Sequence, residues 1–149
     1  MATAIRRADA HWEGTLTSGG GTVRLESVAG AELPVSWRAR VEDPTAGTSP
    51  EELLAAAQAS CFAMALASLL ATHGRTPDRL EVSAEVYLDP ADGGGFRVSR
   101  TRLHVEGVVR GMDADEFSAL AGQAAQGCPV SAAMRGNVDI AIEAALAAA

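Results

Sequence analysis

Cysteine, histidine and aromatic residues are all scarce in this chain of 149 residues, which has two cysteines, three histidines and only 4% aromatic side chains. With so few large rings, alanine, valine and leucine must fill the core. The histidines lie in unrelated segments without the spacing of a metal site. We therefore expect neither a metal nor another cofactor.

Positive charge is also in short supply, with 12 basic against 19 acidic residues and a net charge of -7. Such a surface repels phosphate backbones, which argues against a nucleic-acid partner. The opening segment MATAIRRADAHWEG has two arginines but lacks the apolar stretch of a secretory signal, so we expect a cytoplasmic protein. In that compartment cysteines are more often catalytic or redox-active than structural.

Two familiar catalytic motifs are missing. The G-x-S-x-G turn of many serine hydrolases does not occur, and the glycine runs SGGGT and DGGGF are not followed by the lysine of a phosphate-binding loop. Both runs lie where hairpin turns are expected. The sequence therefore gives little support to hydrolase or nucleotide-binding chemistry.

The first third of the chain shows the alternation of polar and apolar residues that is typical of strands. Residues 10–27 predict two short strands joined by a glycine-rich turn, and residues 33–43 predict a third. In that third strand Arg38 and Arg40 would project from the same face.

A long helix follows, with clear signals at both ends. Ser49 is a typical N-cap, Pro50 suits the first turn, and Glu52 completes a capping box three residues after the cap. Gly74 and Pro77 should end the helix. The predicted helix is about 36 Å long.

The second half of the chain predicts a long hairpin, a helix and a last strand. Residues 79–109 form the hairpin, with a bulge near Arg100. The helix begins at Asp113 and stops at Gly127, and residues 137–144 alternate as the last strand. The predicted order is βββ-α-ββ-α-β.

We interpret the whole chain, residues 1–149, as a single α+β domain. Residues 53–70 carry no charge and are long enough for a membrane span, but the run is rich in alanine and interrupted by polar side chains, which favours a buried helix over insertion. A small domain has few elements to surround such a helix. Partial cover by a second copy is a natural solution, and we expect a homodimer.

The residues alone leave the roles of the two cysteines open. Cys61 lies in the middle of the apolar helix and could be a small core residue, and burial there would raise the pKa of its thiol. Cys128, in the segment GCPV, lies between a helix end and a turn that starts with proline, where backbone amides can lower a thiol pKa. By this argument Cys128 is the better thiolate, and the two cysteines are partners only if the fold brings them together.

Four segments taken together resemble the OsmC/Ohr family of osmotically inducible and organic-hydroperoxide-resistance proteins, and more closely its OsmC branch. They are AHWEG, GTV, SPEELLAAAQASCFAMALA and GCPVS, and the resemblance extends over residues 11–142. It implies antiparallel sheets around a long central helix in an intertwined homodimer. It also implies a thiol-dependent peroxidase without a cofactor, which reduces organic hydroperoxides and, to some degree, hydrogen peroxide.

The resemblance also implies roles for four residues. Cys61 is similar to the family's peroxidatic cysteine and Cys128 to the resolving cysteine, with which it would form a disulfide that an external dithiol, a lipoyl protein or a thioredoxin-like protein, reduces. Glu51 matches the catalytic glutamate. Arg40 best matches the active-site arginine, with Arg38 as the alternative.

One distance limits how these residues can meet. Glu51 and Cys61 are ten positions apart, which on one straight helix means about 15 Å and a rotation of about 280°. Either the helix breaks between them, or the glutamate comes from the other subunit, so we expect a site at the dimer interface. An alternative from another functional class is a redox sensor or binding module that keeps the thiols without turnover.

Overall fold

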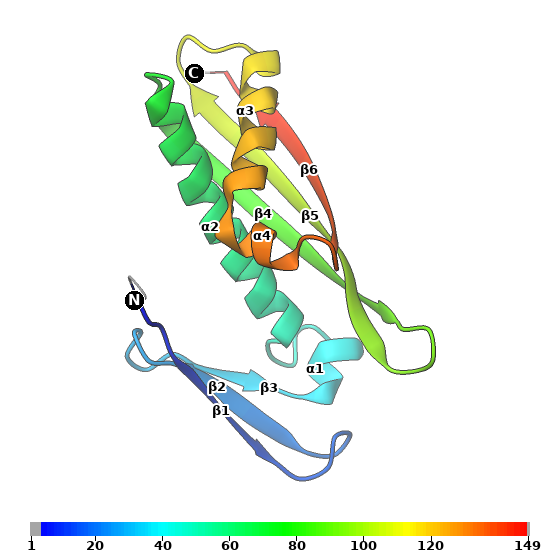
Figure 1. The fold of residues 1–149 in the computed structure, drawn as a ribbon. Helices are drawn as coiled ribbons and strands as arrows, with labels where there is room; N and C mark the ends of the chain where they lie inside the picture. The colour runs from blue at the N-terminus through cyan, green and yellow to red at the C-terminus, as the bar shows by residue number, and fades with distance from the viewer. Residues whose placement is uncertain (1–3, 149) are drawn as a thin grey trace. The chain divides into compact units, whose positions relative to one another are not determined.

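The computed structural model describes residues 4–148 and divides into two compact units, which meet in sequence between Leu53 and Leu54 (Figure 1). Each unit has one three-stranded sheet. The mixed α+β class and the predicted order of the main elements are confirmed, with two short helices added.

The first unit is built on an antiparallel sheet of β1 (Ala8–Glu13), β2 (Gly20–Leu25) and β3 (Glu32–Val35), in that order. This confirms the predicted hairpin of the first two strands. Gly21 allows β1 to lie close, because a Cβ there would come within 1.9 Å of the His11 carbonyl oxygen.

The third strand is shorter than predicted. It ends at Val35, and the next residues form helix α1 (Trp37–Val41) instead of continuing the strand. Ser36 starts the helix: its backbone is extended and its side chain accepts a hydrogen bond of 3.0 Å from the amide of Ala39. The prediction of a strand through residues 37–41 was therefore wrong.

Helix α2 (Pro50–Thr72) begins where the sequence predicted. The Ser49 hydroxyl accepts a 3.1 Å hydrogen bond from the amide of Glu52, which confirms the N-cap. The Glu52 carboxylate accepts from the Thr48 hydroxyl, so it is directed away from the reciprocal bond of a capping box. At the other end Gly74 adopts a φ of +70°, as helix-terminating glycines do.

The sheet of the second unit has the order β4-β5-β6. The strands β4 (Pro77–Pro90) and β5 (Phe96–Val109) form the predicted antiparallel hairpin, whereas β6 (Asp139–Leu146) runs parallel to β5. The prediction of antiparallel sheets was thus wrong for this last pair. The chain between β5 and β6 is helical, and a helical crossover of this kind lets the next strand run parallel to the one before it.

The predicted bulge lies in β5. Tyr87 pairs with Arg100, whereas the next residue, Leu88, pairs with Val98, so Ser99 is the extra residue. Its position beside Arg100 confirms the change of phase that the sequence indicated.

Two helices connect β5 to β6. The first is α3 (Ala114–Gly127), which Asp113 caps through a 2.8 Å bond from the amide of Glu116, and the second is α4 (Pro129–Met134). Gly107 on β5 leaves room for α3, because a Cβ there would come within 2.4 Å of the Phe117 ring.

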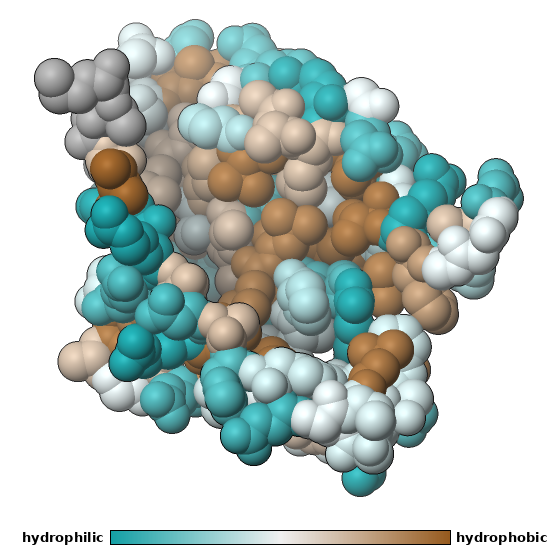
Figure 2. Space-filling view, turned by 60° about the horizontal axis from the view of Figure 1, so that its bottom comes forward, coloured by the Kyte–Doolittle hydropathy of each residue, from teal (hydrophilic) through white to brown (hydrophobic). Residues whose placement is uncertain are grey.

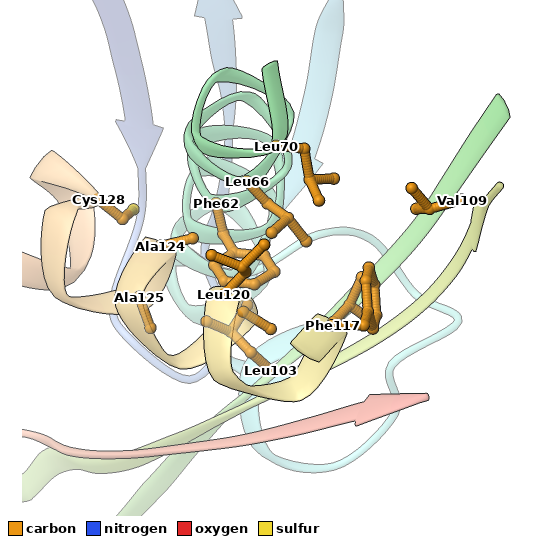
Figure 3. Close-up of a cluster of buried hydrophobic side chains, with 12 residues drawn as sticks. Phe62, Leu66, Leu70, Leu103, Val109, Phe117, Leu120, Ala124, Ala125 and Cys128 are labelled. Carbon is orange, nitrogen blue, oxygen red and sulfur yellow. The ribbon is translucent and has the colours of Figure 1, made fainter. Parts of the chain in front are cut away.

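The core of the second unit lies between α2, α3 and the sheet (Figure 3). Its buried residues are mainly aliphatic, with two phenylalanines and one cysteine. They are Phe62, Leu66, Leu70, Leu103, Val105, Val109, Phe117, Leu120, Ala121, Ala124, Ala125 and Cys128.

Helix α2 is long and apolar enough to cross a membrane by length and composition, a property that the core helices of soluble proteins share. Phe62, Leu66 and Leu70 recur every fourth residue and are fully buried, so one face of α2 belongs to the core of the second unit (Figure 3). Other faces of the helix are more accessible, and Met64 is 68% exposed. Figure 2 shows hydrophobic residues at the molecular surface over a broad area.

Candidate active site

An arginine–glutamate pair is held within the first unit. Arg40, in α1, donates from Nε to both carboxylate oxygens of Glu51 at 3.2 and 3.1 Å, and from Nη2 to Oε1 at 2.7 Å. Glu51 stands at the start of α2 and only 8% of its surface is exposed. Two nitrogens of the guanidinium face two oxygens, a geometry that fixes the plane of the arginine and leaves Nη1 outside the pair.

The turn of α1 separates the two arginines that the sequence could not distinguish. Residues two apart share a face on a strand but lie about 200° apart on a helix. Arg38 therefore points elsewhere and pairs with Asp43 at 2.8 Å, with 67% of its side chain exposed. Of the two, Arg40 is the arginine that contacts Glu51.

A pocket of about 300 Å³ adjoins this pair in the first unit. Its lining is almost entirely apolar and includes Trp12, Leu16, Trp37 and Leu53, together with Arg40. The Arg40 guanidinium lies 6.0 Å from the centre of the Trp37 ring, within the range of a cation–π contact. The pocket thus combines one positively charged side chain, Arg40, with an otherwise largely hydrophobic lining.

The two cysteines meet within the second unit. Cys61 is half-buried in the middle of α2, while Cys128 is fully buried at the junction of α3 and α4. Both are free thiols, and their side chains lie close enough for each to shift the pKa of the other. The fold therefore brings together two sulfurs that are far apart in sequence.

The surroundings of the two thiols act in opposite directions. Burial raises the pKa of Cys61, and contact with Cys128 raises it further, although the amide of Val130 partly offsets both. Burial also raises the pKa of Cys128, but the Ser131 amide, the Cys61 thiol and the Ser131 hydroxyl outweigh it, so the pKa lies below its usual value. Within this unit Cys128 is the better thiolate, as the sequence argument predicted.

The predicted site residues are therefore found as two pairs. Arg40 contacts Glu51 in the first unit, and Cys61 contacts Cys128 in the second. Each pair combines one residue of α2 with one residue from elsewhere in its unit, Arg40 in α1 and Cys128 at the junction of α3 and α4.

A comparison with known proteins identifies the family. The family model described as OsmC-like protein matches residues 42–143, a segment that includes Glu51 and both cysteines. The chain belongs to this OsmC-like family. The resemblance that its motifs indicated is confirmed.

Several OsmC-like relatives match most of the chain. Peroxiredoxin OsmC of Escherichia coli (strain K12) is 38% identical over 138 residues, which cover 93% of this chain and 95% of the relative. The organic hydroperoxide resistance protein OhrA of Bacillus subtilis (strain 168) is 35% identical over 128 residues, with coverage of 85% and 87%.

Solved structures show the same OsmC-like fold. An organic hydroperoxide resistance protein OsmC from Legionella pneumophila aligns with a TM-score of 0.76 and 26% identity, covering 97% of this chain and 99% of its own. OhrB of Bacillus subtilis aligns with a TM-score of 0.75 and 26% identity, with coverage of 96% and 99%.

The structure of this OsmC-like chain also reveals polar residues that the sequence argument missed. Gln58, Thr101 and Ser131 are fully buried, and the Gln58 amide donates hydrogen bonds to the hydroxyls of the other two. A sequence signal existed for two of them, because Gln58 precedes Cys61 by three positions and Ser131 follows Cys128 by three. On a helix, residues at that spacing lie on the same side.

Proposed function

We propose that this protein is a cysteine-based peroxidase that reduces organic hydroperoxides. The observation that carries the proposal is the direct contact between the Cys61 and Cys128 thiols in the core of a chain whose relatives are named peroxiredoxin and organic hydroperoxide resistance protein. A pair of reduced thiols in contact can close to a disulfide without large movement.

The proposed reaction has two steps. The Cys61 thiolate attacks the terminal oxygen of the hydroperoxide, the O–O bond breaks, and the departing alkoxide takes a proton to leave as an alcohol. Cys61 is now a sulfenic acid, and Cys128 attacks its sulfur to form the disulfide and release water. An external dithiol, such as a lipoyl protein or a thioredoxin-like protein, then restores both thiols.

Arg40 and Glu51 are proposed to serve the first step. Within its own unit the pKa of Cys61 is raised, and a nearby cation would favour its thiolate. The Arg40 guanidinium, held in plane by Glu51, would stabilise that thiolate and polarise the leaving oxygen of the peroxide. Glu51 would act through the arginine, as a positioning residue.

The apolar pocket beside Arg40 supports an organic substrate. Its lining of aromatic and aliphatic side chains suits an alkyl or aryl group, while the arginine suits the peroxide end. Hydrogen peroxide has no alkyl or aryl group, so it would gain no binding energy from the hydrophobic lining. We therefore place organic hydroperoxides ahead of hydrogen peroxide as substrates.

We further propose that the chain acts as a homodimer in the cytoplasm and that its two units form one OsmC-like domain. The partly exposed, uncharged faces of α2 favour cover by a second copy. The solved relatives align over nearly the whole chain, which supports a single domain. A cysteine pair with a redox role, in place of a structural disulfide, suits the cytoplasm.

Rapid mixing with cumene hydroperoxide, followed by non-reducing mass analysis, tests the function. The wild-type protein should form a disulfide and, with a dithiol, consume many equivalents of peroxide per chain. Cys61→Ser should lose turnover, and Cys128→Ser should over-oxidise without forming an intramolecular disulfide. Full turnover by Cys61→Ser would contradict the assignment, and consumption of about one equivalent by the wild type would indicate a sensor.

A further inference from the structure

The side-chain amide of Gln58 links α2, which carries Cys61, to α4, which begins directly after Cys128. Gln58 on α2 donates from Nε2 to Thr101 Oγ1 on β5 at 3.0 Å and to Ser131 Oγ on α4 at 3.4 Å. All three side chains have an exposed fraction of 0%. The cluster therefore lies wholly inside the second unit, against the cysteine pair.

The direction of these hydrogen bonds determines what the Ser131 hydroxyl can do. Both hydrogens of the Gln58 amide are used as donors, so Ser131 Oγ accepts on that side and its own hydrogen can be given to another acceptor. Ser131 lies in α4, three residues after Cys128, and its hydroxyl contributes to lowering the pKa of that thiol, as a donor to the sulfur anion does. In this order the Gln58 amide donates to the Ser131 hydroxyl, which is left free to donate to the sulfur anion.

The opposite orientation of the amide is less favourable. Gln58 Oε1 is the one buried side-chain nitrogen or oxygen atom among the described residues that has no hydrogen-bond partner. Reversing the amide would put two unpaired N–H groups at that place instead of one unpaired oxygen. A buried oxygen without a hydrogen-bond partner costs free energy, so an apolar side chain of this size would suit the core better. Packing therefore does not explain why Gln58 stands there.

We propose that Gln58 is a positioning residue for disulfide formation, because its amide holds the Ser131 hydroxyl as a donor to the Cys128 sulfur. This inference rests on the proposed peroxidase function. In the step concerned, the Cys128 thiolate attacks the Cys61 sulfenic acid, the S–S bond forms, the S–O bond breaks, and the departing hydroxide takes a proton to become water. Gln58 increases the thiolate fraction of Cys128 without touching the reacting atoms.

The two steps of the reaction separate this role from a general defect. With cumene hydroperoxide and rapid quenching, Gln58→Leu should form the sulfenic acid at the wild-type rate but close the disulfide roughly tenfold more slowly, because the Ser131 hydroxyl is no longer held as a donor to the sulfur anion. Thr101→Val is the matched control. It removes the other bond of the same amide and should leave both rates unchanged.

A pH titration provides a readout that needs no peroxide. In a Cys61→Ser background, the ultraviolet absorbance of the thiolate reports on Cys128 alone. Its midpoint should move to higher pH in Gln58→Leu and in Ser131→Ala, with no further movement when the two changes are combined, and it should stay in place in Thr101→Val. Gln58→Met repeats the test with a side chain of similar length should Gln58→Leu fold poorly.

The outcomes distinguish the two levels of the proposal. Wild-type disulfide closure and an unchanged midpoint in the Gln58 variants would overturn the role of Gln58 while leaving the peroxidase function intact. Absence of any sulfenic acid or disulfide in the wild-type protein would overturn the peroxidase function, and the titration would still decide whether Gln58 acts on Cys128.

Discussion

The reactivity of single residues in this protein depends on the secondary-structure element in which they lie. Cys61 and Cys128 are the same residue type in contact with each other, yet burial within α2 raises the pKa of one, and the amides at the start of α4 help to lower the pKa of the other. These opposite shifts favour the thiolate of Cys128 over that of Cys61. Such an arrangement fits a nucleophile that is activated only in the complete site and a partner that is ready to resolve it.

The first prediction at this scale concerns the arginine pair. Arg40→Lys replaces a planar fork by a point charge that cannot hold both oxygens of Glu51 in the same way, so kcat/KM for cumene hydroperoxide should fall about 10- to 100-fold. The pH midpoint of sulfenic acid formation should rise, because the Cys61 thiolate is less well stabilised.

Arg38→Lys is the matched control for this prediction. It makes the same chemical change two positions away, at an exposed arginine that pairs with Asp43, and exposed ion pairs contribute little. Its steady-state kinetics should match those of the wild type. Equal losses in the two variants would show that Arg40 has no special role.

At the scale of elements, the sequence predicted the long segments well and one short segment badly. The cap of α2, the cap of α3 and the bulge in β5 all carry local signals that do not depend on distant contacts, and each was predicted correctly. Residues 37–41 are too few to show the period of a helix, and their alternation fits a strand equally well. The cap by Ser36 decided the outcome.

The same reasoning explains which parts of the candidate site could be foreseen. The family motifs pointed to Cys61, Cys128, Glu51 and Arg40 one by one, but only the structure shows which of two neighbouring arginines contacts the glutamate. The hydrogen bonds of Gln58 join residues 43 and 73 positions apart, and no local pattern indicates such a contact.

The second prediction tests whether α1 positions its arginine. Ser36→Ala removes the side-chain cap of α1 and should lower the free energy of unfolding by about 1 kcal/mol. It should also reduce kcat/KM, because Arg40 lies in the last turn of this five-residue helix. Asp113→Ala removes the cap of α3 and should cost a similar amount of stability with full activity. Denaturant unfolding and peroxidase assays measure both, and unchanged activity in Ser36→Ala would contradict the role of α1.

At the scale of the whole molecule, the question is how the arginine–glutamate pair and the cysteine pair could form one active site. Glu51 and Cys61 belong to one unbroken helix, α2, so ten positions along it place the two side chains about 15 Å apart along the axis. A peroxide bond is far shorter than that. The site is built either within one chain or with an arginine–glutamate pair from a second chain, and the proposed dimer provides for the second arrangement.

Mixing two inactive variants distinguishes these arrangements. Arg40→Gln and Cys61→Ser chains, unfolded together in equal amounts and refolded, should recover roughly a quarter of wild-type activity if each site takes its arginine from one chain and its cysteines from the other, because half of the dimers are then mixed and each has one intact site. Sites built within one chain would give no recovery, since every site would carry one of the two changes. Each variant refolded alone provides the background, and gel filtration of the mixture checks that dimers have formed. No recovery from a mixture that is fully dimeric would refute the shared site.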